Sequence, residues 1–323
     1  MADEQWLIDS HHHFWQLDGS VYYPWLSDRI VNDFFLGDYA SIRRSFLPPQ
    51  LQDLIPQGYR LLGSVHCEAE ASREQACDET AWIDSLQQQE AFPSAHVGWA
   101  SFGSDLCADV LDRQMQSALF RGVRAKPVTA TAAKNCNQVK GSSGSLQDSN
   151  WCASLGLLDE RNLSWDLRVP AWHLADAAKV LESFPNLGVV LNHCGLPWDR
   201  SAAGLSSWRQ QMTILAENPK VCVKLSELGV PGQPWNPIEN LDLLCQTIDI
   251  FGPKRCLFAS NMPVAQLQVS YQRWLALVEK AIELSAPGAG DDILWRNACY
   301  WYRLDKKRLA TPDGISDDSI ILS

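Results

Sequence analysis

The chain has 323 residues, a hydrophobic content of 46% and a formal net charge of −11. These values suit one globular domain with a large core, and the acidic charge disfavours nucleic acids and anionic membranes as partners. No apolar run approaches the ~18 residues of a membrane helix, and residues 1–5 are acidic where a secretion signal is basic and then apolar, so we expect a cytoplasmic protein.

Ten cysteines are spread over the chain without paired Cys-x-x-Cys spacing. This spacing indicates neither a zinc ribbon nor a disulfide framework. We therefore expect most of them to be buried, reduced thiols.

Short apolar runs alternate with longer helical patterns along the chain. The predicted strands span residues 6–13, 60–67, 96–102, 120–126, 163–169, 187–193, 221–226 and 255–260, and the predicted helices span 72–89, 105–118, 145–157, 172–183, 206–217, 238–251, 269–284 and 292–302. The strands are apolar along most of their length, as parallel strands covered on both faces are. Eight such units predict an α/β fold, a single-domain (β/α)8 TIM barrel over residues 1–309.

A missing motif, two loops and the C-terminal tail add to this fold prediction. A doubly wound sheet has little support, because no Gly-x-Gly-x-x-Gly follows a strand. The loops at 129–149 and 229–236 each follow a predicted strand, so we expect them to cover the catalytic end of the barrel. The polar tail 310–323 is expected to be disordered or to dock on a neighbour.

The run from Leu7 to Trp15 contains three consecutive histidines at the end of the first predicted strand. Side chains at i and i+2 share a face of a strand, so His11 and His13 converge while His12 points away. A tag remnant is the simpler explanation of a histidine cluster, but a tag would not lie inside a β-type apolar run. The pair predicts a metal or acid/base site.

Polar residues also mark the ends of nearly all the other predicted strands, where the chemistry of a barrel is found. Taken singly, each could be a rim ion pair or a structural histidine, but imidazoles on strands one and six with cations between them favour a site. The candidates are Glu68, Arg124, Lys126, Arg168, His193, Lys224 and Asn261.

Several motifs resemble the amidohydrolase superfamily, in particular the amidohydrolase-related branch with sugar-acid lactonases and pyrone-dicarboxylate lactonase. The resemblance spans residues 6–303 and keeps the order of the motifs. It implies a (β/α)8 barrel in which His11, His13 and His193 surround the site and a strand-eight residue acts on the nucleophilic water. The motifs are Ile8-Asp9-x-His11-x-His13-Phe14-Trp15, Arg121-Gly122-Val123-Arg124, Asn192-His193-x-Gly195-x-Pro197, Val223-Lys224-Leu225-Ser226 and Phe258-Ala259-Ser260-Asn261-x-Pro263.

The chain departs from the lactonases at strand eight, where they usually carry Asp and this sequence has Asn261. An amide cannot act as a general base, although it can orient water. Glu68 or a histidine is then the candidate base.

A metal is one of two options for this site. His11, His13 and His193 could hold one divalent ion, with Zn²⁺ favoured, and a zinc-bound water has a pKa of about 7. Related lactonases can also work without a metal, with the histidines polarising the substrate carbonyl. The sequence leaves both options open.

The leading hypothesis is an enzyme, a hydrolase that opens a lactone or related cyclic ester of a carboxylated or polyhydroxylated small molecule. His11, His13, His193, Glu68 and Asn261 are its predicted catalytic residues, and Arg124, Lys126, Arg168, Lys224 and Trp15 its predicted substrate contacts. The alternatives are a metal-dependent decarboxylase or other lyase acting on an aromatic or cyclic acid, and a non-catalytic binder. The expected partner is a small molecule, and homo-oligomerisation is left open.

Overall fold

The computed structural model describes residues 4–28, 30 and 34–310, and its core is a parallel barrel of eight strands. Each strand pairs in parallel with the next along the chain. Beyond the strand ends, the N–H of His13 donates to the Met262 carbonyl over 2.8 Å, and that of Asn261 donates to the His11 carbonyl over 2.7 Å. These bonds join the first strand to the segment after the last one. The strands are β1 (Gln5–His12), β2 (Tyr59–Cys67), β3 (Ala95–Gly98), β4 (Phe120–Val123), β5 (Ser164–Leu167), β6 (Val189–Leu191), β7 (Val221–Leu225) and β8 (Cys256–Phe258).

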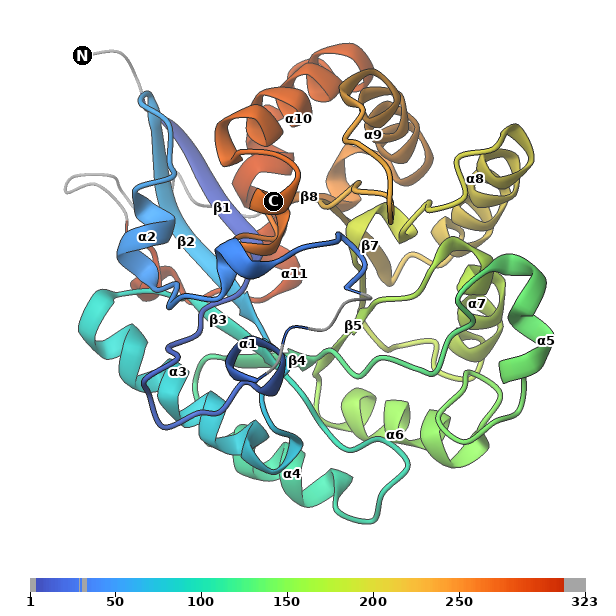
Figure 1. Ribbon diagram of the computed structural model, residues 1–323, viewed down its shortest axis with the longest axis horizontal. Helices are drawn as coiled ribbons and strands as arrows, with labels where there is room; N and C mark the ends of the chain where they lie inside the picture. Colours follow the sequence, from blue (N-terminus) through green and yellow to red (C-terminus); the bar gives the residue numbers. More distant parts are fainter. Residues whose placement is uncertain (1–3, 29, 31–33, 311–323) are drawn as a thin grey trace.

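Helices surround the barrel, as Figure 1 shows. Asp148 and Asn236 cap the first turns of α6 and α9 with their side-chain oxygens. The helices are α1 (Pro24–Ser27), α2 (Pro48–Gln52), α3 (Ala76–Glu90), α4 (Cys107–Gln114), α5 (Cys136–Val139), α6 (Ser149–Glu160), α7 (Leu174–Leu181), α8 (Ala202–Ala216), α9 (Pro237–Phe251), α10 (Tyr271–Ser285) and α11 (Asn297–Trp301).

The core has two parts. Most of the buried apolar residues form one large cluster, which includes the apolar sides of the helices. A smaller cluster contains strand residues such as Ile8, Val97 and Leu257. Trp295 and Tyr302, from the π-helical turn Asp292–Arg296 and the end of α11, belong to this smaller cluster and are almost fully buried. The C-terminal segment therefore completes the packing beside the strands, which leaves their opposite ends for the site.

The predicted barrel is confirmed, and all eight strands lie where the apolar runs placed them. Several end earlier than predicted: β6 and β8 stop shortly before His193 and Asn261, which have positive φ, while β3, β4 and β5 end at residues 98, 123 and 167. Sequence reasoning missed α1, α2 and α5; α5 lies within the predicted covering loop 129–149. The predicted tail lies outside the described residues from 311 onward.

Two further expectations bear on the class of protein. All ten cysteines are free thiols, as predicted. In the part of the chain that the structure describes, no helix has both the length and the apolar character needed to cross a bilayer.

Candidate active site

A cavity of about 440 Å³ lies at the carboxyl ends of the strands. Part of its lining is apolar and includes four aromatic residues, one from α1 and three from residues 34–39. The polar part comes from the ends of β1, β2, β4, β5, β6 and β8. The apolar lining residues are Trp25, Phe34, Phe35, Tyr39, Ala69 and Val264, and the polar ones are His13, Glu70, Arg124, Lys126, Arg168, His193 and Asn261.

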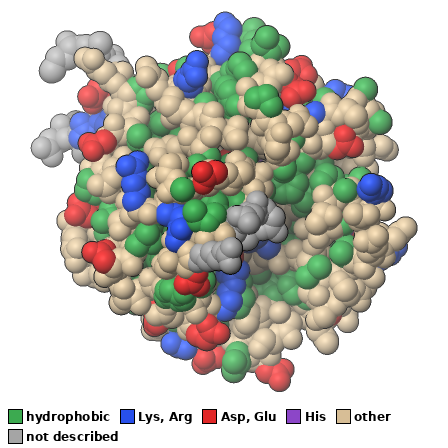
Figure 2. Space-filling model, viewed as in Figure 1, with side chains coloured by type: hydrophobic (Ala, Val, Ile, Leu, Met, Phe, Trp, Pro, Cys, Tyr) green, Lys and Arg blue, Asp and Glu red, His purple; other side chains and the backbone are tan. Residues whose placement is uncertain are grey.

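The alternation of side chains along β1 delivers two histidines to the site. The rings of His11 and His13 lie 5.0 Å apart, while His12 packs against Phe14 and His66. All seven histidines of the chain are buried, and none shows on the face seen in Figure 2. The predicted convergence of His11 and His13 is therefore present, and His12 lies apart from it.

His193 approaches the pair from the end of β6. Its ring lies 4.7 Å from that of His11, and its Nδ1 is 2.8 Å from the hydroxyl oxygen of Ser226. Its backbone has a φ of 57°, a region that histidine and asparagine enter more readily than most residues. Burial, followed by the charge of Arg168, holds the pKa of His193 well below its usual value. The ring is therefore neutral, with a lone pair on one of its two nitrogens.

A fully buried lysine lies beneath the histidines. Lys224 donates from Nζ to Nδ1 of His11 over 3.0 Å and to Oδ1 of Asp166 over 2.5 Å. Asp166 also accepts hydrogen bonds from Tyr302 and Asn192. Burial and the charge of Lys224 hold the pKa of His11 well below its usual value. Lys224 is thus an internal cation of the barrel rather than a residue of the cavity wall.

Arg124 is held by the carboxylate of Glu68, the residue that follows β2. Its Nε donates to Oε1 of Glu68 over 2.8 Å, and Nη2 donates to the Glu68 carbonyl over 2.6 Å. Burial raises the pKa of Glu68, but the charges of Arg124, Lys126 and Arg73 outweigh it, and the net shift is downward. Glu68 is therefore an ionised partner of Arg124 and is not among the lining residues.

The two other cations of the cavity differ in their pairing. Lys126 forms an ion pair with Glu70. Arg168 has no ion pair or hydrogen bond to any described residue, and its guanidinium lies 5.5 Å from the ring centre of Phe35 and 5.8 Å from that of Trp198. Burial lowers the pKa of Arg168 to about 10, so it remains charged at neutral pH. Of the two lining arginines, Arg168 is therefore the one that no described carboxylate pairs with, and it is available to a ligand.

The structure brings most of the predicted residues together. His13, Arg124, Lys126, Arg168, His193 and Asn261 line the cavity; His11 and Lys224 lie beneath it, and Glu68 lies behind Arg124. Trp15 does not line it. Its fully buried indole donates to the carbonyl of Arg44 and packs against Trp25, so its position does not support the predicted substrate contact.

Sequence reasoning missed the aromatic wall and two acidic residues, Glu70 and Glu227. The wall has a sequence signal, because residues 14–46 are unusually rich in Phe, Trp and Tyr. Glu227 has no such sequence signal, because a carboxylate after the end of an apolar strand is common at the rim of a barrel. Its significance depends on its contact with Asn261, to which it is hydrogen-bonded.

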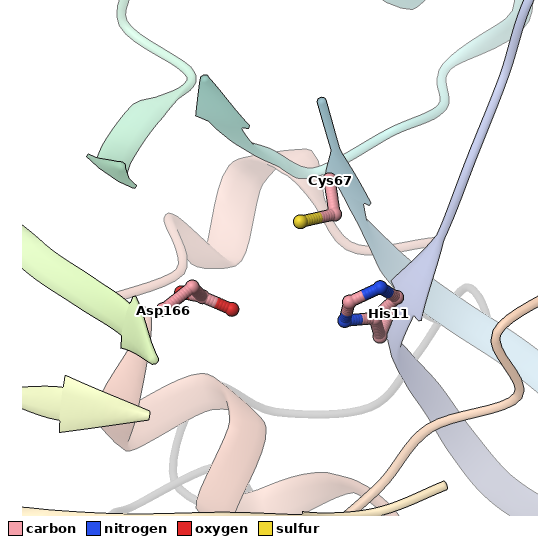
Figure 3. Close-up of side chains that lie close together, drawn as sticks. All are labelled: His11, Cys67 and Asp166. Atoms are coloured by element: carbon pink, nitrogen blue, oxygen red, sulfur yellow. The ribbon is translucent and has the colours of Figure 1, made fainter. Parts of the chain in front are cut away.

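The geometry of the potential metal ligands can be tested against the needs of Zn²⁺. Ligand atoms of His11, Cys67 and Asp166 lie within 4.8 Å of one another and face a common space inside the barrel, as Figure 3 shows. Burial raises the pKa of Cys67 to about 12, so the residue is a thiol in the metal-free protein and would have to lose its proton to bind zinc. The ammonium of Lys224 already lies between His11 and Asp166. This group does not fit a divalent cation.

The three histidines predicted as metal ligands are not arranged as a metal site either. Among the described residues, the nitrogens of His11, His13 and His193 do not all lie within 4.8 Å of one another. The two ring nitrogens of His11 face Lys224 and Arg124 at 3.0 and 3.5 Å, and those of His13 face the Cys67 carbonyl and Asn261. Two fixed cations beside His11 would repel a metal ion placed there.

Comparisons with known proteins place these observations in a family. The chain is 31% identical over 303 residues to the uncharacterised protein y4mH of Sinorhizobium fredii, covering 92% of this chain and 98% of that one. It is 28% identical over 298 residues to L-fucono-1,5-lactonase of Burkholderia multivorans, with 89% and 92% covered. A crystal structure of an amidohydrolase from Burkholderia multivorans with bound zinc has a TM-score of 0.74 and 26% identity, with 93% and 99% covered.

The family model described as amidohydrolase matches residues 8–304. This match includes every strand of the barrel except the first residues of β1, and all the polar residues of the cavity. The chain therefore belongs to the amidohydrolase family, and it is an enzyme.

Proposed function

We propose that this enzyme hydrolyses a lactone of a carboxylated small molecule. The observation that carries the proposal is one cavity in which two histidines, an oriented amide and three cationic side chains meet. The relative named as a fuconolactonase supports lactone opening as the reaction type. The aromatic wall suits a flat ring, and the guanidinium of Arg168, which has no ion pair to any described residue, suits its carboxylate.

The reaction follows from the placement of these groups. Water attacks the lactone carbonyl, and the ring nitrogen Nε2 of His193 accepts its proton, because Nδ1 is engaged with Ser226. Arg124, held by Glu68, stabilises the negative charge that develops on the carbonyl oxygen, with Lys224 adding positive charge from below. The proton then passes to the ring oxygen as the carbon–oxygen bond breaks, which gives an open hydroxy acid.

In this mechanism Glu68 positions Arg124 rather than acting as the base. Its carboxylate is already committed to Arg124, and it is not among the residues that line the cavity, where the attacking water would lie. The role predicted from sequence is thus replaced in the proposal by that of an anchor.

The reaction type is tested with a panel of five- and six-membered lactones and of hydroxybenzoic acids. Proton release reports lactone opening, and carbon dioxide release reports decarboxylation. We expect base uptake and an open-chain acid from at least one carboxylated lactone. Carbon dioxide from a hydroxybenzoate with no lactone opening would favour the decarboxylase alternative instead. Binding without turnover of either set would favour a non-catalytic binder.

Arg168→Ala should separate substrate anchoring from chemistry. One charge-assisted hydrogen bond contributes ~1.5–3 kcal/mol, so we expect KM for a carboxylated lactone to rise about 10- to 100-fold. The KM for an uncharged lactone should change little. Arg161→Ala is the matched control, because Arg161 pairs with Asp112 at the surface. Equal effects of Arg168→Ala on charged and uncharged lactones would rule out the anchoring role.

A further inference from the structure

Glu227 is a buried carboxylate immediately beyond β7, and no sequence motif of the site includes it. Its side chain spans two donors: Oε1 accepts the N–H of Gly229 over 2.9 Å, and Oε2 accepts from Nδ2 of Asn261 over 3.0 Å. It is 4% exposed, and its φ of 39° is unusual for a residue other than glycine. Burial raises the pKa of Glu227, and the bonds from Asn261 and Gly229 counter part of that rise.

Asn261 lies between this carboxylate and the cavity. Its backbone is held at both sides, since its N–H donates to the His11 carbonyl and its own carbonyl accepts from Ala265. Its Oδ1 lies 3.2 Å from Nε2 of His13, and the residue lines the cavity. The amide has one end that donates and one that accepts, so its function depends on which end faces the cavity.

An ionised carboxylate only accepts hydrogen bonds, so it selects one of the two amide orientations. With Nδ2 bound to Glu227, the carbonyl oxygen of Asn261 is turned toward His13 and the cavity. We propose that Glu227 is a positioning residue that holds Asn261 as an oriented acceptor for the attacking water, a role that rests on the proposed hydrolysis. The water donates one proton to this oxygen while its lone pair faces the lactone carbonyl.

The hydrogen bond between Glu227 and Asn261 predicts what happens when the carboxylate and the amide are exchanged between these two positions. In Glu227→Gln, the Gly229 N–H still donates to the side-chain oxygen at position 227. The NH₂ group of the new amide therefore faces Asn261. Asn261 must then turn over and present a donor to the cavity, while residue 227 keeps both of its hydrogen bonds. In Asn261→Asp, two carboxylates face each other, which disfavours the folded, ionised pair. In the double variant, the new amide at position 227 donates to the new carboxylate at position 261, whose second oxygen again faces the cavity as an acceptor.

The experiment measures kcat, KM and thermal stability for wild type, both single variants and the double variant. We expect Glu227→Gln to keep the wild-type Tm and KM while kcat falls by about 10²-fold, as misplacement of a reacting group can cause. Asn261→Asp should lose both stability and activity. The double variant should recover the wild-type Tm, and its kcat should be at least tenfold higher than that of Asn261→Asp. Such coupling is expected of residues in contact. Glu79→Gln is the control, because Glu79 is also fully buried and accepts a backbone N–H.

The outcomes separate this inference from the proposed function. If Asn261→Asp is as active as wild type, or if the two substitutions are additive in both Tm and kcat, Glu227 does not orient Asn261. If the wild-type protein opens no lactone, the proposed reaction fails, but coupled Tm changes still support the pairing and additive changes overturn it. An unchanged kcat in Glu227→Gln would also overturn the positioning role.

Discussion

His193→Asn is expected to lower kcat by ~10²–10⁴-fold, the usual contribution of a positioned acid or base. Asparagine tolerates the positive φ at this position, so the fold should be retained. Its amide cannot accept the proton of the attacking water, because amides are not basic at ordinary pH. The measurement is steady-state kinetics on the lactone found to be turned over, with circular dichroism as the check on folding.

A second histidine provides the control for this variant. His96 is equally buried but bonds to Thr80 on α3, outside the barrel interior. His96→Gln should therefore leave kcat close to the wild-type value even if it lowers stability. Near-normal turnover by His193→Asn would remove His193 from the proton-transfer step.

Lys224→Met is expected to destabilise the fold by ~3–5 kcal/mol, because it leaves Asp166 charged and without its cation in the barrel interior. Both side chains are fully inaccessible to solvent, and Nζ of Lys224 lies 2.5 Å from Oδ1 of Asp166. Urea unfolding gives the change as a shift of the midpoint. Activity should also fall, since His11 loses the donor at its Nδ1.

The double variant Asp166→Asn/Lys224→Met tests the cause of that loss. Removing both charges should restore most of the stability, because a buried pair replaced as a whole is often nearly neutral. Lys280→Met is the surface control: its pair with Glu283 is exposed and should contribute at most about 1 kcal/mol. A loss in the double variant as large as in Lys224→Met would mean that packing, and not charge, explains the effect.

The sequence predicts the barrel and the composition of the site from local signals. Strand positions follow from apolar runs, and the carboxyl ends of parallel strands meet at one end of a barrel. His13, Arg124, Arg168, His193 and Asn261 could therefore be assigned to one place before any contact was known. The strand ends were placed too late because the local apolar pattern does not show where hydrogen bonding between neighbouring strands stops.

The pairing of those residues could not be read in the same way. Lys224 and Asp166 are 58 residues apart, and Glu68 and Arg124 are 56 apart, so their contacts depend on how strands pack around the barrel. Arg124, Lys224 and Arg168 look alike in the sequence. Packing makes the first two partners of buried carboxylates and leaves the third without an ion pair to any described residue.

By itself, then, the sequence determined the fold, the family and which residue types meet at the catalytic end, because these depend on periodicity and motif order. Only the tertiary structure decided which cation is available to a ligand, which carboxylate faces Asn261 and which aromatic residues cover the cavity. The physical reason is that hydrogen bonding and charge pairing depend on distances of a few ångströms between strands and loops far apart in the chain.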